Sequence, residues 1–366
     1  MTDTTRATGP NLPGRLGDPD MTLATDPRSD PRMVAVLEPL GLAGQANPIP
    51  LTADSSLEDI RSLAALGEPG FQQLFDGLFE ALTPVEGVES STEVIAGVDG
   101  NDITLYIHRP ASDTGPRPGI LHIHGGGMVI LTAADLNYHR WRDELARSLV
   151  VVGVEFRNAA GALGCHPFPA ALDDCTSALE WMHAHREDLG VSKLVVSGES
   201  GGGNLTLATS LKASQDGRLD MIDGVYAQCP YISGTYANPP PELPSLHEND
   251  GYFLANDLMG YFVEAYDPGG ANLTNPLAWP WHASVDDLRG MPPHAVSVNE
   301  LDPLRDEGLD YYRMLVRAGV PTYCRTVNGT CHAGDVLMPS AIPEVYAASA
   351  RDLMFFAFSL AAASRG

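Results

Sequence analysis

Basic residues are scarce in this chain of 366 residues, which has 22 lysines and arginines against 47 aspartates and glutamates and a formal net charge of -25. Nucleic acids and anionic membranes bind proteins through clustered positive charge, so this composition argues against both as partners. An acidic surface also repels anionic molecules at a distance. The composition therefore favours a neutral small molecule as the ligand.

Cysteines are also few, and the five present form no C-x-x-C pair. An odd number of widely spaced cysteines in a long chain is typical of reduced thiols rather than of a disulfide framework. The amino-terminal stretch MTDTTRATGPNLPGRLGDPD lacks the apolar region of a secretory signal, and we find no run of about 18 apolar residues that predicts a membrane span. We expect a cytoplasmic protein without a membrane partner, and a homo-oligomer stays open.

Four segments follow one another along the chain. Residues 1–85 begin with an arm rich in Pro, Gly and Asp and continue with helical apolar spacing, which predicts short helices that form part of a cap. Residues 86–230 and 280–366 alternate strand-like and helix-like runs and are predicted to be the two parts of a catalytic core. Residues 231–279 interrupt this alternation with a triple proline and the aromatic stretch YFLANDLMGYFVEAY, which indicates a cap insertion.

The alternating runs define the fold class. STEVIAGVDGNDITLYIHRP predicts a β-hairpin that turns at Asp99 and Gly100. Helical segments then separate the strand-like runs GILHIH, VVVGVEF, KLVVSG, GVYAQCPY, HAVSVN and TYCRTV, and a last helix is expected from about Ile342 to Ala363. Alternation of this kind predicts the α/β class, with a mostly parallel central sheet and helices on both faces.

Ser200 lies in the motif G-x-S-x-G, as GESGG, directly after a predicted strand and directly before a predicted helix. A sharp strand-to-helix turn exposes the serine hydroxyl above the sheet, and the glycines on either side of it avoid collisions with neighbouring backbone. A phosphate-binding loop would need a lysine after the glycines, and a dinucleotide site would need G-x-G-x-x-G spacing; neither is present. We interpret Ser200 as a nucleophile.

A second glycine-rich turn, HIHGGGM, follows an earlier buried strand. Consecutive glycines let backbone amides point at a substrate oxygen without side chains in the way, so we expect Gly126 and Gly127 to form an oxyanion hole together with the amide of Gly201. His124 is interpreted as a structural hydrogen-bonding residue that shapes this loop. His122 is expected to point into the opposite layer.

A serine nucleophile needs a base, and in α/β-hydrolases the base is a histidine that follows its acid late in the chain. His332, in VNGTCHAGD, comes after the last predicted strand and suits that role. The segment NELDPLRDEG offers four acids, of which Asp302 is chosen because it follows a strand directly and precedes a proline. The other three are Glu300, Asp306 and Glu307.

Two cysteines near the candidate base offer another interpretation. Cys331 adjoins His332, and Cys324 lies a few residues earlier in the chain. This arrangement suggests either a cysteine–histidine pair or a metal site. Adjacent residues seldom point the same way, and no set of residues has zinc-like spacing. Both cysteines are better interpreted as small buried side chains, so we expect neither a metal nor a cofactor.

These motifs resemble those of the hormone-sensitive-lipase-like esterases of the α/β-hydrolase fold. The matching pieces are HGGG at 124–127, GESGGGN at 198–204, DPLRDEG at 302–308 and GTCHAGD at 329–335. The resemblance covers the chain from about residue 30 to its end. Two departures are visible: the family more often has alanine where this chain has Gly201, and it commonly has an aromatic residue shortly after the histidine, where this chain reads HAGD.

The resemblance implies a serine carboxylesterase that acts through an acyl-enzyme and needs no cofactor. The short predicted insertion and the lack of an evident lipid-binding patch favour short- to medium-chain or small-molecule esters, and the resemblance alone adds lactones. It also implies that Ser200, Asp302 and His332 are the triad, and that the amino-terminal helices and the 231–279 insertion together cover the acyl pocket. The same triad also serves amidases and formamidases, which we keep as an alternative. A receptor without turnover is disfavoured because the chain retains all three residues.

Overall fold

One eight-stranded sheet forms the centre of the computed structural model, which describes residues 12–52, 54–112 and 115–363. The strand order is β1-β2-β4-β3-β5-β6-β7-β8. The β1–β2 and β2–β4 pairs are antiparallel, and every other pair is parallel. The strands are β1 (Val88–Ala96), β2 (Asp102–Pro110), β3 (Arg117–Ile123), β4 (Val150–Val154), β5 (Val191–Glu199), β6 (Gly224–Gln228), β7 (His294–Asn299) and β8 (Thr322–Val327).

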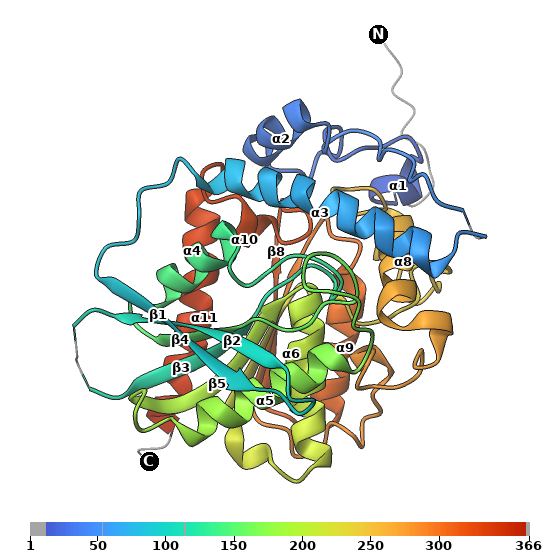
Figure 1. Ribbon diagram of the computed structural model, residues 1–366. Coiled ribbons are helices and arrows are strands. Elements are labelled where there is room, and N and C mark those ends of the chain that lie inside the picture. The colour runs from blue at the N-terminus through green and yellow to red at the C-terminus, as the bar shows by residue number, and fades with distance from the viewer. Residues whose placement is uncertain (1–11, 53, 113–114, 364–366) are drawn as a thin grey trace.

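Helices cover both faces of this sheet, as Figure 1 shows. Helices α4 and α11 contact each other on one face, and α5 and α6 contact each other on the opposite face. The helices are α1 (Gly14–Gly17), α2 (Pro31–Leu37), α3 (Leu57–Phe79), α4 (Leu136–Leu145), α5 (Ala170–Ala184), α6 (Gly201–Gln215), α7 (Ser245–Glu248), α8 (Asn256–Tyr266), α9 (Arg305–Arg317), α10 (Gly334–Leu337) and α11 (Pro343–Ala363). The predicted α/β fold class is thereby confirmed.

The hairpin predicted around Asp99 and Gly100 is confirmed, since β1 and β2 pair over their full length. The short helices predicted before residue 85 are partly wrong, because α3 is a single helix of 23 residues that continues through Pro69. Proline interrupts helical hydrogen bonding. Here the aromatic face continues beyond it, and the buried residues Phe75 and Phe79 hold the second half of the helix against the core.

Helices α3 and α8 pack against each other, although about 180 residues separate them in the sequence. In Figure 1 they lie together above one end of the sheet, on the side where α1 and α2 are also found. We use the name cap for the layer that α3 and α8 form. Their contact joins the first predicted segment to the predicted insertion.

The amino-terminal arm is packed on the body of the protein from residue 12 to residue 35, whereas residues 1–11 of the predicted arm lie outside the described residues. Leu23 is fully buried. Arg28 forms ion pairs with Asp26, at 2.7 Å, and with Glu248 of the insertion. The Asp26 carboxylate also accepts a hydrogen bond from the Tyr252 hydroxyl at 3.1 Å. The arm therefore ties down the insertion.

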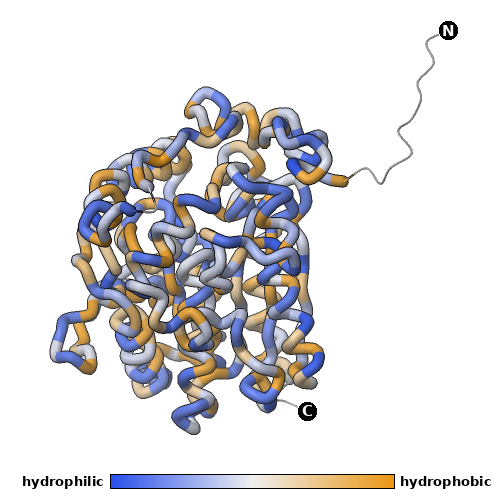
Figure 2. The backbone as a smooth tube through the Cα atoms, turned by 90° about the vertical axis from the view of Figure 1, so that its right-hand side faces the viewer, coloured by the Kyte–Doolittle hydropathy of each residue, from blue (hydrophilic) through white to orange (hydrophobic). Residues whose placement is uncertain are grey.

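Helix α11 has a length and hydropathy that by themselves would allow its residues Pro343–Ala362 to cross a membrane, although charged residues interrupt its apolar sequence. In the structure this helix packs against β3, β5 and β6, and Asp352 lies 3.5 Å from Arg325 of β8. Figure 2 shows hydrophobic residues spread along the described part of the chain, as expected where many elements contribute side chains to one core.

The strand-to-helix turn around Ser200 is built on a backbone contact with the neighbouring strand. A Cβ atom at Gly202 would lie 1.9 Å from the Ile123 carbonyl oxygen and 2.5 Å from that of His124. At Gly198 a Cβ atom would lie 2.3 Å from the same Ile123 oxygen. No side chain fits at either position, which is the steric requirement that the motif predicts.

Replacing Gly202 by alanine should therefore destabilise the protein by about 1–3 kcal/mol or more, because a rigid carbonyl cannot move away from the added methyl group. Gly70 in α3 is the matched control, because a Cβ atom there meets nothing within 4 Å. Gly70→Ala should stabilise the helix by up to about 1 kcal/mol. Urea unfolding of both variants measures the difference; equal free energies of unfolding would contradict the contact.

Candidate active site

Ser200 occupies the turn between β5, which ends at Glu199, and α6, which begins at Gly201. Its φ of 57° lies in the left-handed region, where residues other than glycine are strained. The Ser200 Oγ lies 2.9 Å from His332 Nε2, and His332 Nδ1 lies 2.8 Å from Asp302 Oδ2. The structure thus brings the three residues chosen from the sequence into one hydrogen-bonded chain.

Each candidate acid contacts a different group, and only Asp302 reaches His332 among the four. Glu300 accepts a hydrogen bond from the Gly329 amide at 2.8 Å. Asp306 accepts one from the Ser245 amide at 2.7 Å. Glu307 faces the start of the insertion instead, where its carboxyl group is bound by Ile232 and Tyr236.

Burial and two hydrogen bonds fix Asp302 in place. The carboxylate is fully buried, and its second oxygen accepts a hydrogen bond from the Leu304 amide at 2.9 Å. The Asn249 side chain donates to the Asp302 carbonyl oxygen at 3.1 Å. With one oxygen held by the following turn, the other points at His332, so the imidazole has one favourable orientation.

The glycines chosen for the oxyanion hole lie beside Ser200. Gly126 and Gly127 both have positive φ, at 101° and 64°. Among the described residues, none of the amides of Gly126, Gly127 and Gly201 donates to another group of the protein. A Cβ atom at Gly201 would lie only 2.6 Å from the Gly127 nitrogen. At this spacing of the two loops an alanine at position 201 would collide with the Gly127 amide.

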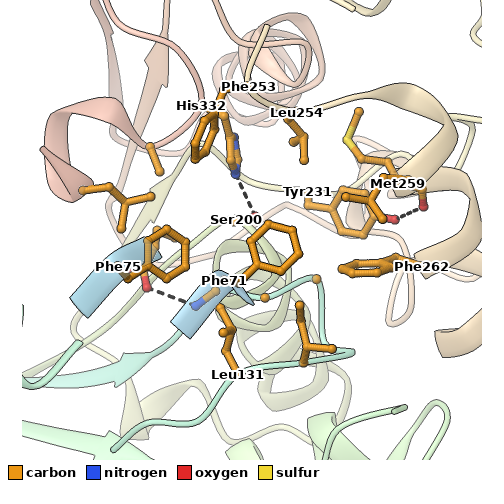
Figure 3. A pocket seen from close by; sticks show the side chains of 18 of the residues that line it. Phe71, Phe75, Leu131, Ser200, Tyr231, Phe253, Leu254, Met259, Phe262 and His332 are labelled. Carbon is orange, nitrogen blue, oxygen red and sulfur yellow. Dashed lines mark hydrogen bonds between the residues drawn. The ribbon is translucent and has the colours of Figure 1, made fainter. Parts of the chain in front are cut away.

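A mainly apolar cavity of about 110 Å³ lies above Ser200 and His332. The cap supplies much of its wall: Phe71 and Phe75 come from α3, and Met259 and Phe262 come from α8 (Figure 3). We call this the catalytic cavity. Where the resembled family has an aromatic residue after the histidine, Ala333 and Leu337 line the wall here.

The cysteine interpretation favoured above fits the structure. Cys331 is fully buried and Cys324 is partly buried. In the described part of the chain, two triplets have ligand atoms close enough for a metal ion: His108 with His139 and Asp143, and Cys229 with Asp302 and His332. The second triplet contains Asp302 and His332, which already form a hydrogen bond with each other beside Ser200. In the first, Arg142 donates to His108 Nε2 at 3.0 Å, and its positive charge opposes a cation there.

A family model described as the α/β hydrolase fold matches residues 120–335, which is more than half of the chain. The chain belongs to the α/β-hydrolase family. An arylesterase of Saccharolobus solfataricus is 30% identical to this α/β-hydrolase over 72% of the chain and 82% of the relative. The esterase LipI of Mycobacterium tuberculosis is 28% identical over 92% of the chain and 96% of the relative.

Solved structures are similar over nearly the whole chain. Brefeldin A esterase, described as a bacterial homologue of human hormone-sensitive lipase, has a TM-score of 0.91 and 47% identity and covers 96% of this chain and 99% of its own. Esterase Est22 has a TM-score of 0.82 and 38% identity, with coverage of 92% and 98%. The resemblance to the hormone-sensitive-lipase-like esterases is confirmed.

Glu199 is a residue of this α/β-hydrolase that the sequence analysis overlooked. It occupies the variable position before the serine, and its side chain is buried. One carboxylate oxygen accepts a hydrogen bond from the Gly125 amide at 3.0 Å, and the other lies 3.1 Å from His122 Nε2. Glu199 thus links the serine turn to the glycine-rich loop. A charged residue at the end of a buried strand was the available signal.

His124 has the structural role expected of it, whereas His122 points in another direction than expected. His124 Nδ1 lies 2.8 Å from the Gly125 oxygen, and burial lowers the pKa of His124 to about 3, so the ring is neutral. This fits its structural interpretation. The prediction for His122 is wrong: both rings contact Tyr138, because residues two apart in a strand face the same side.

A buried carboxylate also fastens the cap. Glu68 of α3 is buried, and it accepts hydrogen bonds from the amides of Leu131, at 2.6 Å, and Ala162, at 2.7 Å. Leu131 follows the glycine-rich loop and lines the catalytic cavity. The position of α3 above Ser200 is therefore set by charge-assisted hydrogen bonds as well as by apolar packing.

Glu307 fastens the start of the insertion in a similar way. One of its oxygens accepts hydrogen bonds from the Ile232 amide and the Tyr236 hydroxyl, both at 2.7 Å. The other oxygen has no partner among the described residues. Burial raises the pKa of Glu307 to about 8, so the group is mostly protonated at neutral pH.

This pKa predicts a pH-dependent stability. Between the ordinary glutamate pKa and about 8, the unfolded chain loses the Glu307 proton while the folded chain keeps it, so the stability due to the neutral carboxyl falls as the pH rises. Glu307→Gln should remove this loss. Relative to wild type, the variant should gain on the order of a few kcal/mol between pH 5 and pH 8 in urea unfolding.

The exposed Glu80 supplies the control, because Glu80→Gln should change stability little at either pH. A Glu307→Gln effect of equal size at pH 5 and pH 8 would show that the native carboxyl is ionised throughout.

Proposed function

We propose that this α/β-hydrolase is a serine carboxylesterase in which Ser200 is the nucleophile, His332 the general base and Asp302 the acid that orients it. The observation that carries the proposal is the hydrogen-bonded chain from Ser200 Oγ through both imidazole nitrogens to the buried Asp302 carboxylate. Named relatives and structural neighbours that are esterases support the reaction class. The short distances suit proton transfer without rearrangement.

The reaction runs in two halves. His332 Nε2 takes the Ser200 proton while Oγ attacks the ester carbonyl, and the amides of Gly126, Gly127 and Gly201 receive the negative charge on the carbonyl oxygen. His332 then gives the proton to the leaving alcohol oxygen, and an acyl-serine forms. A water molecule, deprotonated by the same nitrogen, then attacks the acyl carbon. The bond from that carbon to Ser200 Oγ breaks, His332 returns the proton to Oγ, and the carboxylic acid leaves. Asp302 stabilises the imidazolium in both halves.

A neutral ester with a small or medium acyl group is the proposed substrate. The catalytic cavity is small, at about 110 Å³, and apolar. A formal net charge of -25 favours a neutral ligand over nucleic acid or an anionic membrane. We also propose a cytoplasmic location, which the sparse, unpaired cysteines support.

Hydrolysis of p-nitrophenyl esters from acetyl to dodecanoyl tests the proposed nucleophile. Wild type should turn over the short members, and Ser200→Ala should lower kcat by a factor on the order of 10⁶, because no other group attacks the carbonyl. Circular dichroism establishes that the variant is folded. Retained turnover in folded Ser200→Ala would sink the assignment, whereas wild-type activity on amides alone would favour the amidase alternative.

Replacing Asp302 with asparagine tests the choice of acid. The asparagine oxygen keeps the hydrogen bond from the Leu304 amide, so its NH2 group faces His332 and donates to Nδ1 instead of accepting from it. His332 then adopts the wrong tautomer, and kcat should fall by roughly 10⁴-fold. The matched control is Asp306→Asn, which alters an acid of the same segment that contacts Ser245 instead. A larger loss of kcat in Asp306→Asn than in Asp302→Asn would transfer the role to the other acid.

A further inference from the structure

The cap contains a second cavity, of about 260 Å³, between α3, α8 and residues 47–51. We call it the cap cavity. Its lining side chains are apolar except for Asn47 and the hydroxyl-bearing Tyr261. A lining of this kind offers little to a charged or strongly polar ligand and suits a hydrocarbon chain, which gains from leaving water.

Only one layer of side chains separates the cap cavity from the catalytic cavity. Phe71, Leu258 and Phe262 line both. Phe262 also touches the oxyanion loop, since a Cβ atom added to Gly127 would lie 2.7 Å from its ring. The cap cavity therefore begins one side chain away from the glycines that receive the carbonyl oxygen.

The chemistry decides which half of an ester faces this wall. The leaving alcohol oxygen takes its proton from His332, so the alcohol half must lie on the side of that ring. The acyl half then extends away from His332. In Figure 3, His332 and Phe253 lie above Ser200, whereas Phe262 lies to its right and slightly below, away from His332. The acyl chain points toward the wall that the two cavities share.

Phe71 is the member of that wall with room to move. Gly67 and Gly70 precede it on α3, and a Cβ atom at either glycine meets nothing within 4 Å. Phe71 is partly exposed, and its only ring partner among the described aromatic residues is Phe75, at 6.5 Å between centroids. The Phe71 ring therefore has space to change its rotamer without displacing backbone.

We propose that the cap cavity is a subsite for the far end of longer acyl chains and that Phe71 is the side chain that admits them. This inference rests on the proposed esterase function and extends it to acyl groups that exceed the catalytic cavity. Each methylene that enters the cap cavity should raise kcat/KM about three- to fourfold.

The test compares kcat/KM for p-nitrophenyl decanoate with that for p-nitrophenyl butanoate, both below their solubility limits. Gly67→Phe places a ring in the cap cavity and should lower the decanoate-to-butanoate ratio about tenfold, the worth of roughly two methylenes. Phe71→Ala removes part of the wall and should raise the ratio by a similar factor. Gly77→Phe is the matched control, because Gly77 lies on the same helix outside both cavities and in open space, and it should leave the ratio unchanged.

Leu63→Trp fills the same cavity from another position of α3 and replaces Gly67→Phe if that variant does not fold. Unchanged ratios in the folded variants, with butanoate still hydrolysed, overturn the subsite and leave the esterase intact. Wild type that hydrolyses neither ester overturns both proposals. The alcohol series, decyl against butyl acetate, should not respond to Gly67→Phe; a response there instead of in the acyl series overturns the acyl assignment.

Discussion

The contact on which this structure depends is the one between two stretches of bare backbone. The carbonyl oxygen of Ile123, at the end of β3, lies where a side chain at Gly198 or Gly202 would have to be. Because the serine turn and the glycine-rich loop touch backbone to backbone, Ser200 and the amides of Gly126 and Gly127 have a fixed relation to one another. Electrostatic stabilisation of a transition state needs such preorganisation, since donors that must first move stabilise less.

Buried carboxylates hold the parts that surround this contact. Glu199 binds the glycine-rich loop, Glu68 binds the segment that follows it, and Glu307 binds the start of the insertion. Each carboxyl group accepts backbone amides that no helix or strand satisfies. A buried amide without a partner is costly, so these glutamates stabilise irregular segments where the site needs them.

The cap is positioned by the same logic, but its inner surface is apolar. Phe71 and Phe262 contact the catalytic cavity from two helices that are far apart in the sequence. Substrate size is therefore governed by side chains that have no part in the chemistry. Triad and cap can vary independently, which is how one fold serves many esters.

The sequence by itself determined the sheet, its helices and the residues beside Ser200, because strand-period and helix-period patterns and glycine spacing are local properties. The sequence offered four acids but not their contacts, and it gave no role to Glu199 or Glu68. It also predicted that His122 points into the opposite layer, which is wrong. Only the tertiary structure decided which acid meets His332 and how α3 and α8 enclose two cavities. Those relations join segments that are distant along the chain, and distances between them depend on packing, which no local pattern contains.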